Sequence, residues 1–222
     1  MKVLVSGASG DIGKAIAELF LERGHEVVGL DIQPASISHP YYTHIRTDVR
    51  EALPEVEGVE IVVVSHGIQL PDDETIDVNL KGAINVVEKY AFHPRIRSVV
   101  TIGSASGRNG SEFPCYAASK AGLITYTKNV ALRLAKWGAT ANSVSPGGVV
   151  TGSNACIIDE PKLYQEAIDE SLLDKWALPS EIAEWVYFVS VVNRSMTGED
   201  VLIDNGEMLK SHFVWPAANS GN

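Results

Sequence analysis

Cysteine is scarce in this sequence, with two residues in 222. Cys115 and Cys156 cannot build a disulfide framework, and no CxxC spacing points to a metal site. The six histidines are scattered, without HxH, HxxE or HExxH spacing. We therefore predict a reducing compartment and no bound metal.

Positive charge is limited too, and no run of lysine and arginine occurs. The 18 basic residues stand against 28 acidic ones, which gives a net charge of −10 at pH 7. A protein that binds a polyphosphate backbone needs a basic stripe. The charge balance therefore argues against nucleic acid as a partner.

Long apolar runs are missing as well. No stretch approaches the ~18 apolar residues of a transmembrane helix. The first glycine, Gly7, follows only three apolar residues at 3–5, which is too short for the hydrophobic region of a secretory signal. These absences predict a soluble, cytoplasmic protein without a membrane partner.

What the sequence does contain is a regular alternation of strand and helix patterns. Apolar runs predict strands at 3–5, 26–31, 43–47, 61–64, 98–102, 140–144 and 200–204. Helical patterns between them cover 12–20, 75–91, 114–137, 159–174 and 179–192. This order predicts an α/β fold, a doubly wound, Rossmann-type parallel sheet of about seven strands with helices on both faces.

No linker or internal repeat divides the chain, so we predict a single domain over 1–222. The most irregular segment of the sequence is 147–158, which could be mobile. We expect a substrate lid at about 148–175. Six acids fall within 159–174 against Lys162 alone, which indicates a solvated helix face and would discourage a highly anionic substrate. The tail, 207–222, is expected to fray.

Three glycines, Gly7, Gly10 and Gly13, lie between the first strand and the first helix. Such glycines allow a tight turn and let a pyrophosphate approach the free N–H groups at the helix N-terminus. Asp31 follows Gly13 by 18 residues, close to the ~20-residue spacing of a carboxylate that binds a ribose 2′-hydroxyl. The alternative role for Asp31 is that of a turn residue before Pro34.

Asp31 also bears on which cofactor binds. A carboxylate there accepts hydrogen bonds from a 2′-hydroxyl but repels a 2′-phosphate. The next residues, Ile32 and Gln33, supply no cation, and Lys14 lies inside the predicted first helix. The sequence therefore favours NAD(H) over NADP(H).

Tyr116 and Lys120 are four residues apart in the helix predicted over 114–137, so they share one face. A neighbouring ammonium lowers the pKa of a phenol from its ordinary value near ~10, which would make the tyrosine an acid or base closer to neutral pH. The pair alone is weak evidence, because tyrosine and lysine at this spacing are common on helix surfaces.

Several motifs in the right order give this pair a context. They are the YxxxK segment at 116–120, the serine segment at 102–107, the VNLxG-like segment at 77–82, the segment 142–147 followed by Thr151, and the closing strand at 197–206. Together with the glycine loop, they resemble the short-chain dehydrogenase/reductase family, in its short single-domain branch. The resemblance extends from residue 3 to about residue 206.

The resemblance implies catalytic roles for four residues. Tyr116 would be the general acid/base, and Ser104 would hydrogen-bond the substrate oxygen, with Ser106 as a competitor for that role. Lys120 would hold the nicotinamide ribose and lower the pKa of the tyrosine. Asn79 would support a water in a proton relay, although a helix N-cap is its ordinary alternative.

By the same resemblance, a nicotinamide cofactor would contact segments that follow several strands. Asp48 and Val49 resemble the pair that contacts adenine, while His66 could instead be part of a strand-end turn. The cofactor-binding residues implied are Gly7, Ser9, Gly10, Asp11, Ile12, Gly13, Asp31, Ile32, Asp48, Val49, Ser65, His66, Gly67, Tyr116, Lys120, Pro146, Gly147, Val149 and Thr151.

Three features depart from the family pattern. The short branch usually has a glycine where Asp11 stands, whereas Gly10 produces the GxxGxxG spacing of the extended branch of sugar-nucleotide epimerases. The family's NNAG segment is replaced by VSHG at 64–67, and only 12 positions separate Gly67 from Asn79. These departures concern the loops around the pyrophosphate and adenine, and they leave the catalytic residues in place.

The sequence therefore predicts an NAD(H)-dependent oxidoreductase that interconverts a secondary alcohol and a carbonyl group. The alternatives are an NAD-dependent epimerase or isomerase, suggested by the GxxGxxG spacing, and a nucleotide-sensing protein without turnover. The family pairs two long helices, here about 79–91 and 114–137, across a two-fold axis, which predicts a homodimer or homotetramer. The small-molecule substrate itself is not defined by these motifs.

Overall fold

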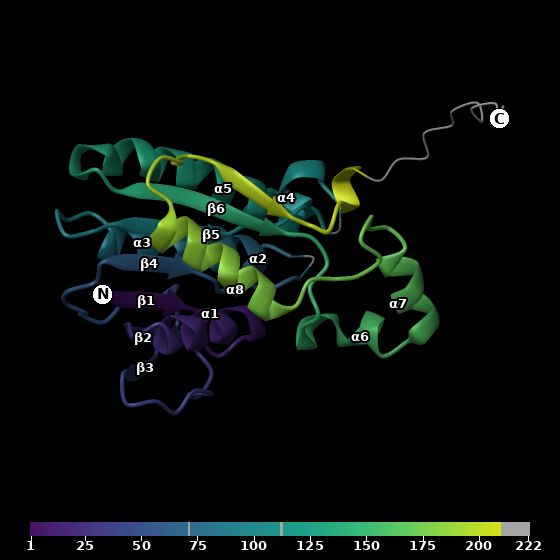
Figure 1. Ribbon diagram of the computed structural model, residues 1–222, viewed down its shortest axis with the longest axis horizontal. Coiled ribbons are helices and arrows are strands. Elements are labelled where there is room, and N and C mark those ends of the chain that lie inside the picture. Colours follow the sequence, from purple (N-terminus) through teal and green to yellow (C-terminus); the bar gives the residue numbers. More distant parts are fainter. Residues whose placement is uncertain (71, 112, 210–222) are drawn as a thin grey trace, which may run out of the picture.

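The computed structural model describes residues 1–70, 72–111 and 113–209. Seven parallel strands form one sheet in the order β3-β2-β1-β4-β5-β6-β7 (Figure 1). Their bounds are β1 (Lys2–Ser6), β2 (Glu26–Asp31), β3 (Tyr42–Arg46), β4 (Ile61–Val64), β5 (Ser98–Ile102), β6 (Thr140–Pro146) and β7 (Asp200–Ile203). The predicted doubly wound, Rossmann-type sheet is confirmed, and each predicted strand lies within two residues of its observed bounds.

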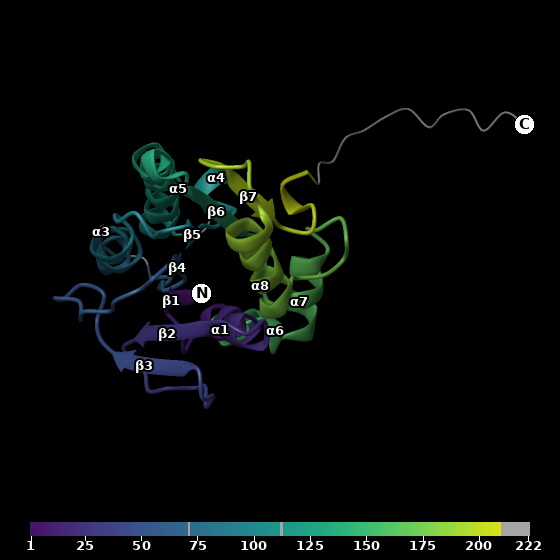
Figure 2. The same cartoon turned by 60° about the vertical axis from the view of Figure 1, so that its left-hand side comes forward.

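Helices cover both faces of the sheet, as Figure 2 shows. One face carries α1 (Asp11–Glu22) and α8 (Pro179–Tyr187), and the other carries α3 (Ala83–Tyr90) and α5 (Pro114–Leu134). Side chains alternate across a strand, so Val3 and Val5 of β1 pack into one buried cluster and Leu4 into the other. The central strands are therefore apolar on both faces, as in β4, where all four residues are buried.

The helix predicted over 75–91 is not a regular α-helix. It consists of α2 (Glu74–Ile76), a π-helical turn η1 (Asp77–Gly82) and α3. Such π-turns inside helices often occur at functional sites. Here the turn contains Asn79, which is fully buried, so the wider backbone coincides with a predicted catalytic residue.

Two other predicted helices change type near their ends. The helix predicted to 137 is α5 followed by a 3-10 turn η2 (Ala135–Trp137), and Gly138 ends it with φ +67°. The helix predicted to 192 is α8 followed by a π-turn η4 (Phe188–Val192). A short helix, α4 (Ser106–Asn109), was not predicted.

The segment after β6 is more ordered than its sequence predicted. It contains a 3-10 turn η3 (Gly152–Asn154) and the helices α6 (Ala155–Ile158) and α7 (Pro161–Ile168), so the expectation of an irregular 147–158 is wrong for its second half. Both helices lie beyond the carboxyl ends of the strands (Figure 1). The tail begins with a 3-10 turn η5 (Glu207–Leu209), and the predicted fraying of 210–222 lies outside the described residues.

In the part of the chain that the structure describes, no helix combines the length and apolar character that crossing a membrane requires.

Candidate active site and cofactor site

The glycine loop joins β1 to α1 with little room for side chains. Gly7 has φ +75°, and a Cβ at Gly13 would overlap the carbonyl oxygen of Gly7. A Cβ at Gly10 would meet that oxygen at an ordinary 3.5 Å, so protein packing does not demand a glycine there. No side chain of Gly10 can cap α1, which leaves the helix N-terminus available to an anion.

Asp31 lies at the carboxyl end of β2 and binds the glycine loop through its carboxylate. Its Oδ2 accepts a hydrogen bond from the Ser9 N–H at 2.9 Å, and its Oδ1 accepts one from the Gln33 N–H at 2.9 Å. The second bond is the turn role that the sequence left open. The first places the carboxylate beside the loop where the 2′-hydroxyl contact was predicted.

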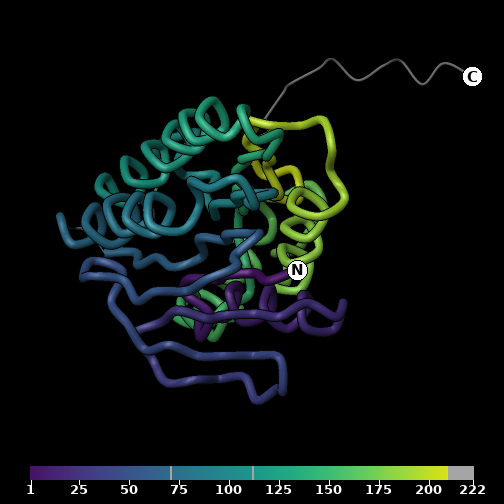
Figure 3. Tube along the Cα trace, turned by 90° about the vertical axis from the view of Figure 1, so that its left-hand side faces the viewer, coloured from purple at the N-terminus to yellow at the C-terminus, as the bar shows by residue number. Residues whose placement is uncertain are grey.

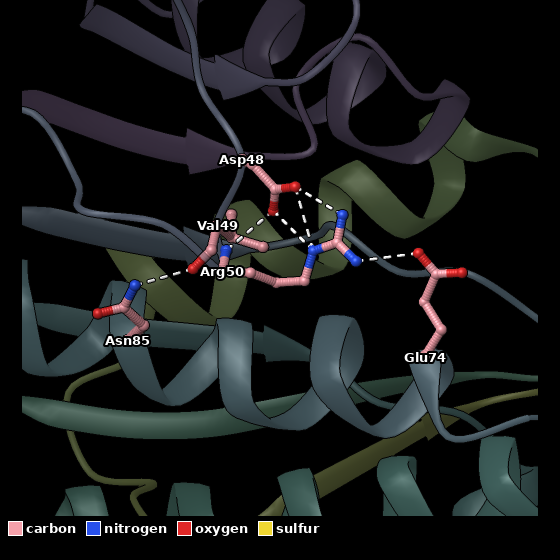
Figure 4. A network of polar contacts seen from close by, with 5 residues as sticks. All are labelled: Asp48, Val49, Arg50, Glu74 and Asn85. Atoms are coloured by element: carbon pink, nitrogen blue, oxygen red, sulfur yellow. Dashed lines mark hydrogen bonds and ion pairs between the residues drawn. The ribbon is translucent and has the colours of Figure 1, made fainter.

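The predicted adenine pair, Asp48 and Val49, follows β3 and is held by two neighbours (Figure 4). The Arg50 guanidinium binds the Asp48 carboxylate, with the shortest contact at 2.6 Å, and donates to Glu74 at 2.9 Å. The hydrogen bonds from Arg50 lower the pKa of Asp48. Asn85 donates to the Val49 carbonyl at 2.8 Å. Sequence reasoning missed Glu74 and Asn85, because no local pattern links them to partners 24 and 36 positions away, and it also missed Arg50, which lies only two residues from Asp48.

His66 serves the strand-end turn that was its alternative role. Its Nε2 lies 3.1 Å from the Val78 carbonyl oxygen, which only accepts, so Nε2 carries the proton. Its Nδ1 then accepts from the Ser6 hydroxyl at 2.7 Å. Burial, reinforced by the positive charge of Lys120, lowers the pKa of His66 to about 4. The ring is therefore neutral at pH 7, and Ser6 and Val78 occupy both of its nitrogens.

Lys120 and Ser104 lie at the carboxyl end of β5, and Tyr116 lies beside Lys120. The Lys120 ammonium donates to the Ile102 carbonyl at 2.9 Å and lies 5.7 Å from the centroid of the Tyr116 ring. Lys120 is 5% exposed, an uncommon position for a lysine. Ser104 is also buried, and its Oγ accepts the Ser106 N–H at 3.1 Å, which gives Ser106 a part in orienting Ser104.

Asn79 is not the helix N-cap that was its ordinary alternative, because it lies inside the π-turn η1. Its Oδ1 accepts the Ile68 N–H and its Nδ2 donates to the Ile68 carbonyl, each at 2.8 Å. Nδ2 also donates to Ser119 at 3.2 Å, and Ser119 donates to the Tyr116 carbonyl at 2.7 Å. The amide of Asn79 therefore ties the loop after β4 to the helix of Tyr116.

The remaining predicted cofactor residues, Pro146, Gly147, Val149 and Thr151, follow β6. Val149 is buried and pairs with Ala177 across an isolated bridge. Immediately after Thr151, the Gly152 N–H donates to the Asp11 carboxylate at 2.7 Å. This bond brings the segment after β6 to the glycine loop, although 141 residues separate the two partners.

The residues present fit a dinucleotide with a nicotinamide at one end. The uncapped start of α1 suits a pyrophosphate, and the Asp31 carboxylate suits a ribose hydroxyl. At Gly67, a Cβ would lie 3.4 Å from both the Lys120 Nζ and the Asn79 Oδ1. A side chain at this position would crowd the ammonium and the amide, and the glycine avoids that contact.

Comparison with known proteins agrees with this geometry. Residues 69–207, more than half of the chain, match the family model described as enoyl-(acyl carrier protein) reductase. Residues 3–131 match the model of the NAD dependent epimerase/dehydratase family. The chain belongs to the short-chain dehydrogenase/reductase family. As such it is an oxidoreductase of a family that binds a nicotinamide cofactor.

Individual relatives cover nearly the whole chain. The 3-oxoacyl-[acyl-carrier-protein] reductase FabG of Thermotoga maritima is 29% identical and covers 91% of this chain and 96% of its own. The ligand-free aldohexose dehydrogenase of Thermoplasma acidophilum has a TM-score of 0.86 at 25% identity, with 97% and 96% covered. A 4-hydroxyisoleucine dehydrogenase in complex with NADH has a TM-score of 0.83 at 26% identity, with 95% and 99% covered. Their substrates differ, so similarity indicates the reaction class alone.

Proposed function

We propose that this chain is an NAD(H)-dependent oxidoreductase that interconverts a secondary alcohol and a carbonyl group. The observation that carries the proposal is the position of the Lys120 ammonium. Its Nζ is 5.7 Å from the centroid of the Tyr116 ring and would be 3.4 Å from a Cβ at Gly67, at the carboxyl ends of the strands, where the glycine loop and Asp31 also lie. A buried ammonium in that position can serve a ribose and a phenol at once.

Each catalytic side chain has a defined task in this proposal. When bound, the nicotinamide accepts or donates the hydride, which is chemistry that the protein itself lacks. The Tyr116 hydroxyl donates a proton to the oxygen as a carbonyl is reduced, and its phenolate form removes one from an alcohol in the reverse direction. Ser104 hydrogen-bonds the same oxygen and stabilises its developing charge. Asn79 holds the loop at Ile68 and supports the water that returns the proton to Tyr116.

Asp31 supports a preference for NAD(H). Its oxygens each keep a lone pair after accepting the Ser9 and Gln33 N–H groups, so the carboxylate can also accept from a ribose 2′-hydroxyl. A 2′-phosphate would meet a like charge at that point.

We further propose that residues 1–222 act as one domain and that 148–175 closes over the substrate. The position of α6 and α7 beyond the carboxyl ends of the strands supports this role (Figure 1). α7 carries no basic residue in its last turn, and the acidic surface of this segment favours an uncharged substrate over a highly anionic one.

A homodimer or homotetramer is proposed through α3 and α5. The two helices form one continuous surface, because Arg133 and Tyr126 of α5 both donate to Glu88 of α3, at 2.5 and 3.0 Å. Leu132 of α5 is 79% exposed, so this surface presents a large apolar side chain that a second copy of the chain could cover.

The match of residues 3–131 to the NAD dependent epimerase/dehydratase model favours a second candidate, an epimerase that retains its cofactor. One assay separates the candidates. The protein is incubated with NAD(H) and a panel of alcohols and ketones while the nicotinamide absorbance is followed. A dehydrogenase changes the absorbance with substrate, an epimerase changes the substrate with no net absorbance change, and a sensing protein binds NADH without turnover.

A further inference from the structure

A basic residue lies next to Asp31 in the sheet, although it is distant in the sequence. In the parallel pairing of β2 with β3, Asp31 is in register with Arg46. Neighbouring strands are ~4.8 Å apart, and residues in register direct their side chains to the same face. Residues 32 and 33 supply no cation, but the pairing with β3 places one beside Asp31.

The Arg46 side chain bends toward the turn after Asp31. Its Nε donates to the Ile32 carbonyl at 2.7 Å, which uses one of the five N–H donors of the guanidinium. The residue is exposed, and no ion pair involves it in the described part of the chain. Arg50, four residues later, is by contrast bound to both Asp48 and Glu74 (Figure 4).

β3 is the outermost strand, as the lower edge of the trace in Figure 3 shows, so ligand atoms can reach its carboxyl end from solvent. Arg46 is its last residue, at the level of the Asp31 carboxylate. The guanidinium, whose Nε binds the carbonyl of the residue after Asp31, thus lies at the same end of the site as the group that would read the 2′ position.

We infer that Arg46 is a second specificity-determining residue, a cation that binds the 2′-phosphate of NADP(H). This inference rests on the proposed nicotinamide site. Arginine binds phosphate through paired, charge-assisted hydrogen bonds, and its two Nη groups are available for them. Asp31 repels the same phosphate, so the chain binds both cofactors. Its affinity for NAD(H) is the higher one, but the difference is smaller than it would be with Asp31 and no Arg46.

Support of the turn does not account for a charged residue at this position. His44, also on β3, already holds the turn through a bond between its Nε2 and the Gln33 carbonyl at 2.9 Å. A neutral donor would do the same at Ile32. The contact with the turn therefore uses neither the charge of Arg46 nor its other N–H groups.

The test compares two adenosine probes that differ only at the 2′ position, 5′-AMP and adenosine 2′,5′-bisphosphate. Calorimetry measures their affinities for wild type, Arg46→Gln and Arg97→Ala. Gln removes the charge and keeps an N–H donor, and Arg97 is an exposed arginine just before the inner strand β5, at the amino ends of the strands and away from Arg46. We expect Arg46→Gln to weaken the bisphosphate about tenfold, the effect of losing one charge-assisted contact, and 5′-AMP less than twofold.

The outcomes separate this inference from the function on which it rests. Wild type that binds neither probe overturns the proposed cofactor site, and the inference with it. If wild type binds 5′-AMP, and Arg46→Gln leaves the ratio of the bisphosphate affinity to the 5′-AMP affinity unchanged, the inference alone is overturned. Equal weakening of both probes also overturns it, because it assigns Arg46 to the turn. A selective loss of bisphosphate affinity in Arg46→Gln, with both affinities unchanged in Arg97→Ala, supports it, and a gain of bisphosphate affinity in Arg46→Gln overturns it.

Discussion

Asp11 and Gly152 join the two segments that would enclose the cofactor: the carboxylate of Asp11 accepts the Gly152 N–H at 2.7 Å. Asp11 is the first residue of α1, where an acid is favoured by the helix dipole. The family's short branch usually has a glycine at this position, which could not make the contact. The departure in the glycine loop thus has a structural consequence 141 residues away.

Loss of this contact should loosen the segment after Thr151. We expect Asp11→Ala to speed hydrogen exchange of the Gly152 amide about tenfold in the protein without cofactor, as befits one lost hydrogen bond to a charged group. Glu18→Ala, which removes an exposed acid from the same helix, is the control and should leave exchange at 151–158 unchanged. Equal exchange in Asp11→Ala and wild type would show that the bond does not hold the segment.

Asp31 should decide between the two cofactors. We expect wild type to bind NADH more tightly than NADPH. Asp31→Ala should reduce this difference in affinity, by weakening NADH binding and by strengthening NADPH binding. The variant loses an acceptor for the 2′-hydroxyl and also a like charge beside the 2′-phosphate. Fluorescence titration with each cofactor measures the ratio, with Glu22→Ala as a variant of equal charge change on the exposed side of α1. Tighter binding of NADPH by wild type would contradict the role given to Asp31.

His66 should make the fold sensitive to mild acid. Its pKa is about 4 in the folded protein and 6.5 as the ordinary value, so the unfolded chain binds more protons between these pH values. The free energy of unfolding therefore falls as the pH drops from 6.5 toward 4, by about 2 kcal/mol between pH 7 and pH 5 from this residue. Urea denaturation at both pH values, on wild type and His66→Ala, isolates this contribution. An equal pH-dependent loss in both proteins would mean that the folded protein does not hold His66 in its neutral form.

The oligomer should depend on the surface of α3 and α5. We expect light scattering to give at least twice the 23.9 kDa chain mass and Leu132→Glu to shift the population toward monomer, because a charge would enter an apolar contact. Tyr41→Glu is the control, since Tyr41 is 64% exposed and lies just before β3. A wild-type chain that stays monomeric at micromolar concentration would contradict the proposed assembly.

Much of this fold could be predicted from sequence, because the signals are local. The apolar run of β4 and the glycines between β1 and α1 depend on neighbours within a few residues. The same holds for the face shared by Tyr116 and Lys120. In the structure the Lys120 Nζ lies 5.7 Å from the centroid of the Tyr116 ring. Family resemblance added the order of the motifs.

What could not be predicted depends on strand order and side-chain reach. Arg46 becomes a neighbour of Asp31 only through the pairing of β2 with β3. Asp11 reaches Gly152 across the carboxyl edge of the sheet. The amide of Asn79, inside the π-turn, binds the loop at Ile68, a contact that no helical periodicity encodes.

The hydroxyl of Tyr116 is the group on which the proposed chemistry depends. Tyr116→Phe removes that hydroxyl and keeps the ring beside Lys120. Tyr126→Phe is the matched control, because it removes a hydroxyl from the same helix whose partner is the surface residue Glu88.

The decisive measurement is turnover of these variants on a substrate whose chemical step limits the rate, followed at the nicotinamide band together with NADH affinity. General acid/base catalysis supplies roughly 10²–10⁴-fold, so we expect Tyr116→Phe to lose turnover by about that factor with NADH affinity little changed. Tyr126→Phe should turn over like wild type. Near-normal turnover by Tyr116→Phe would contradict the assignment of Tyr116 as the residue that moves the proton.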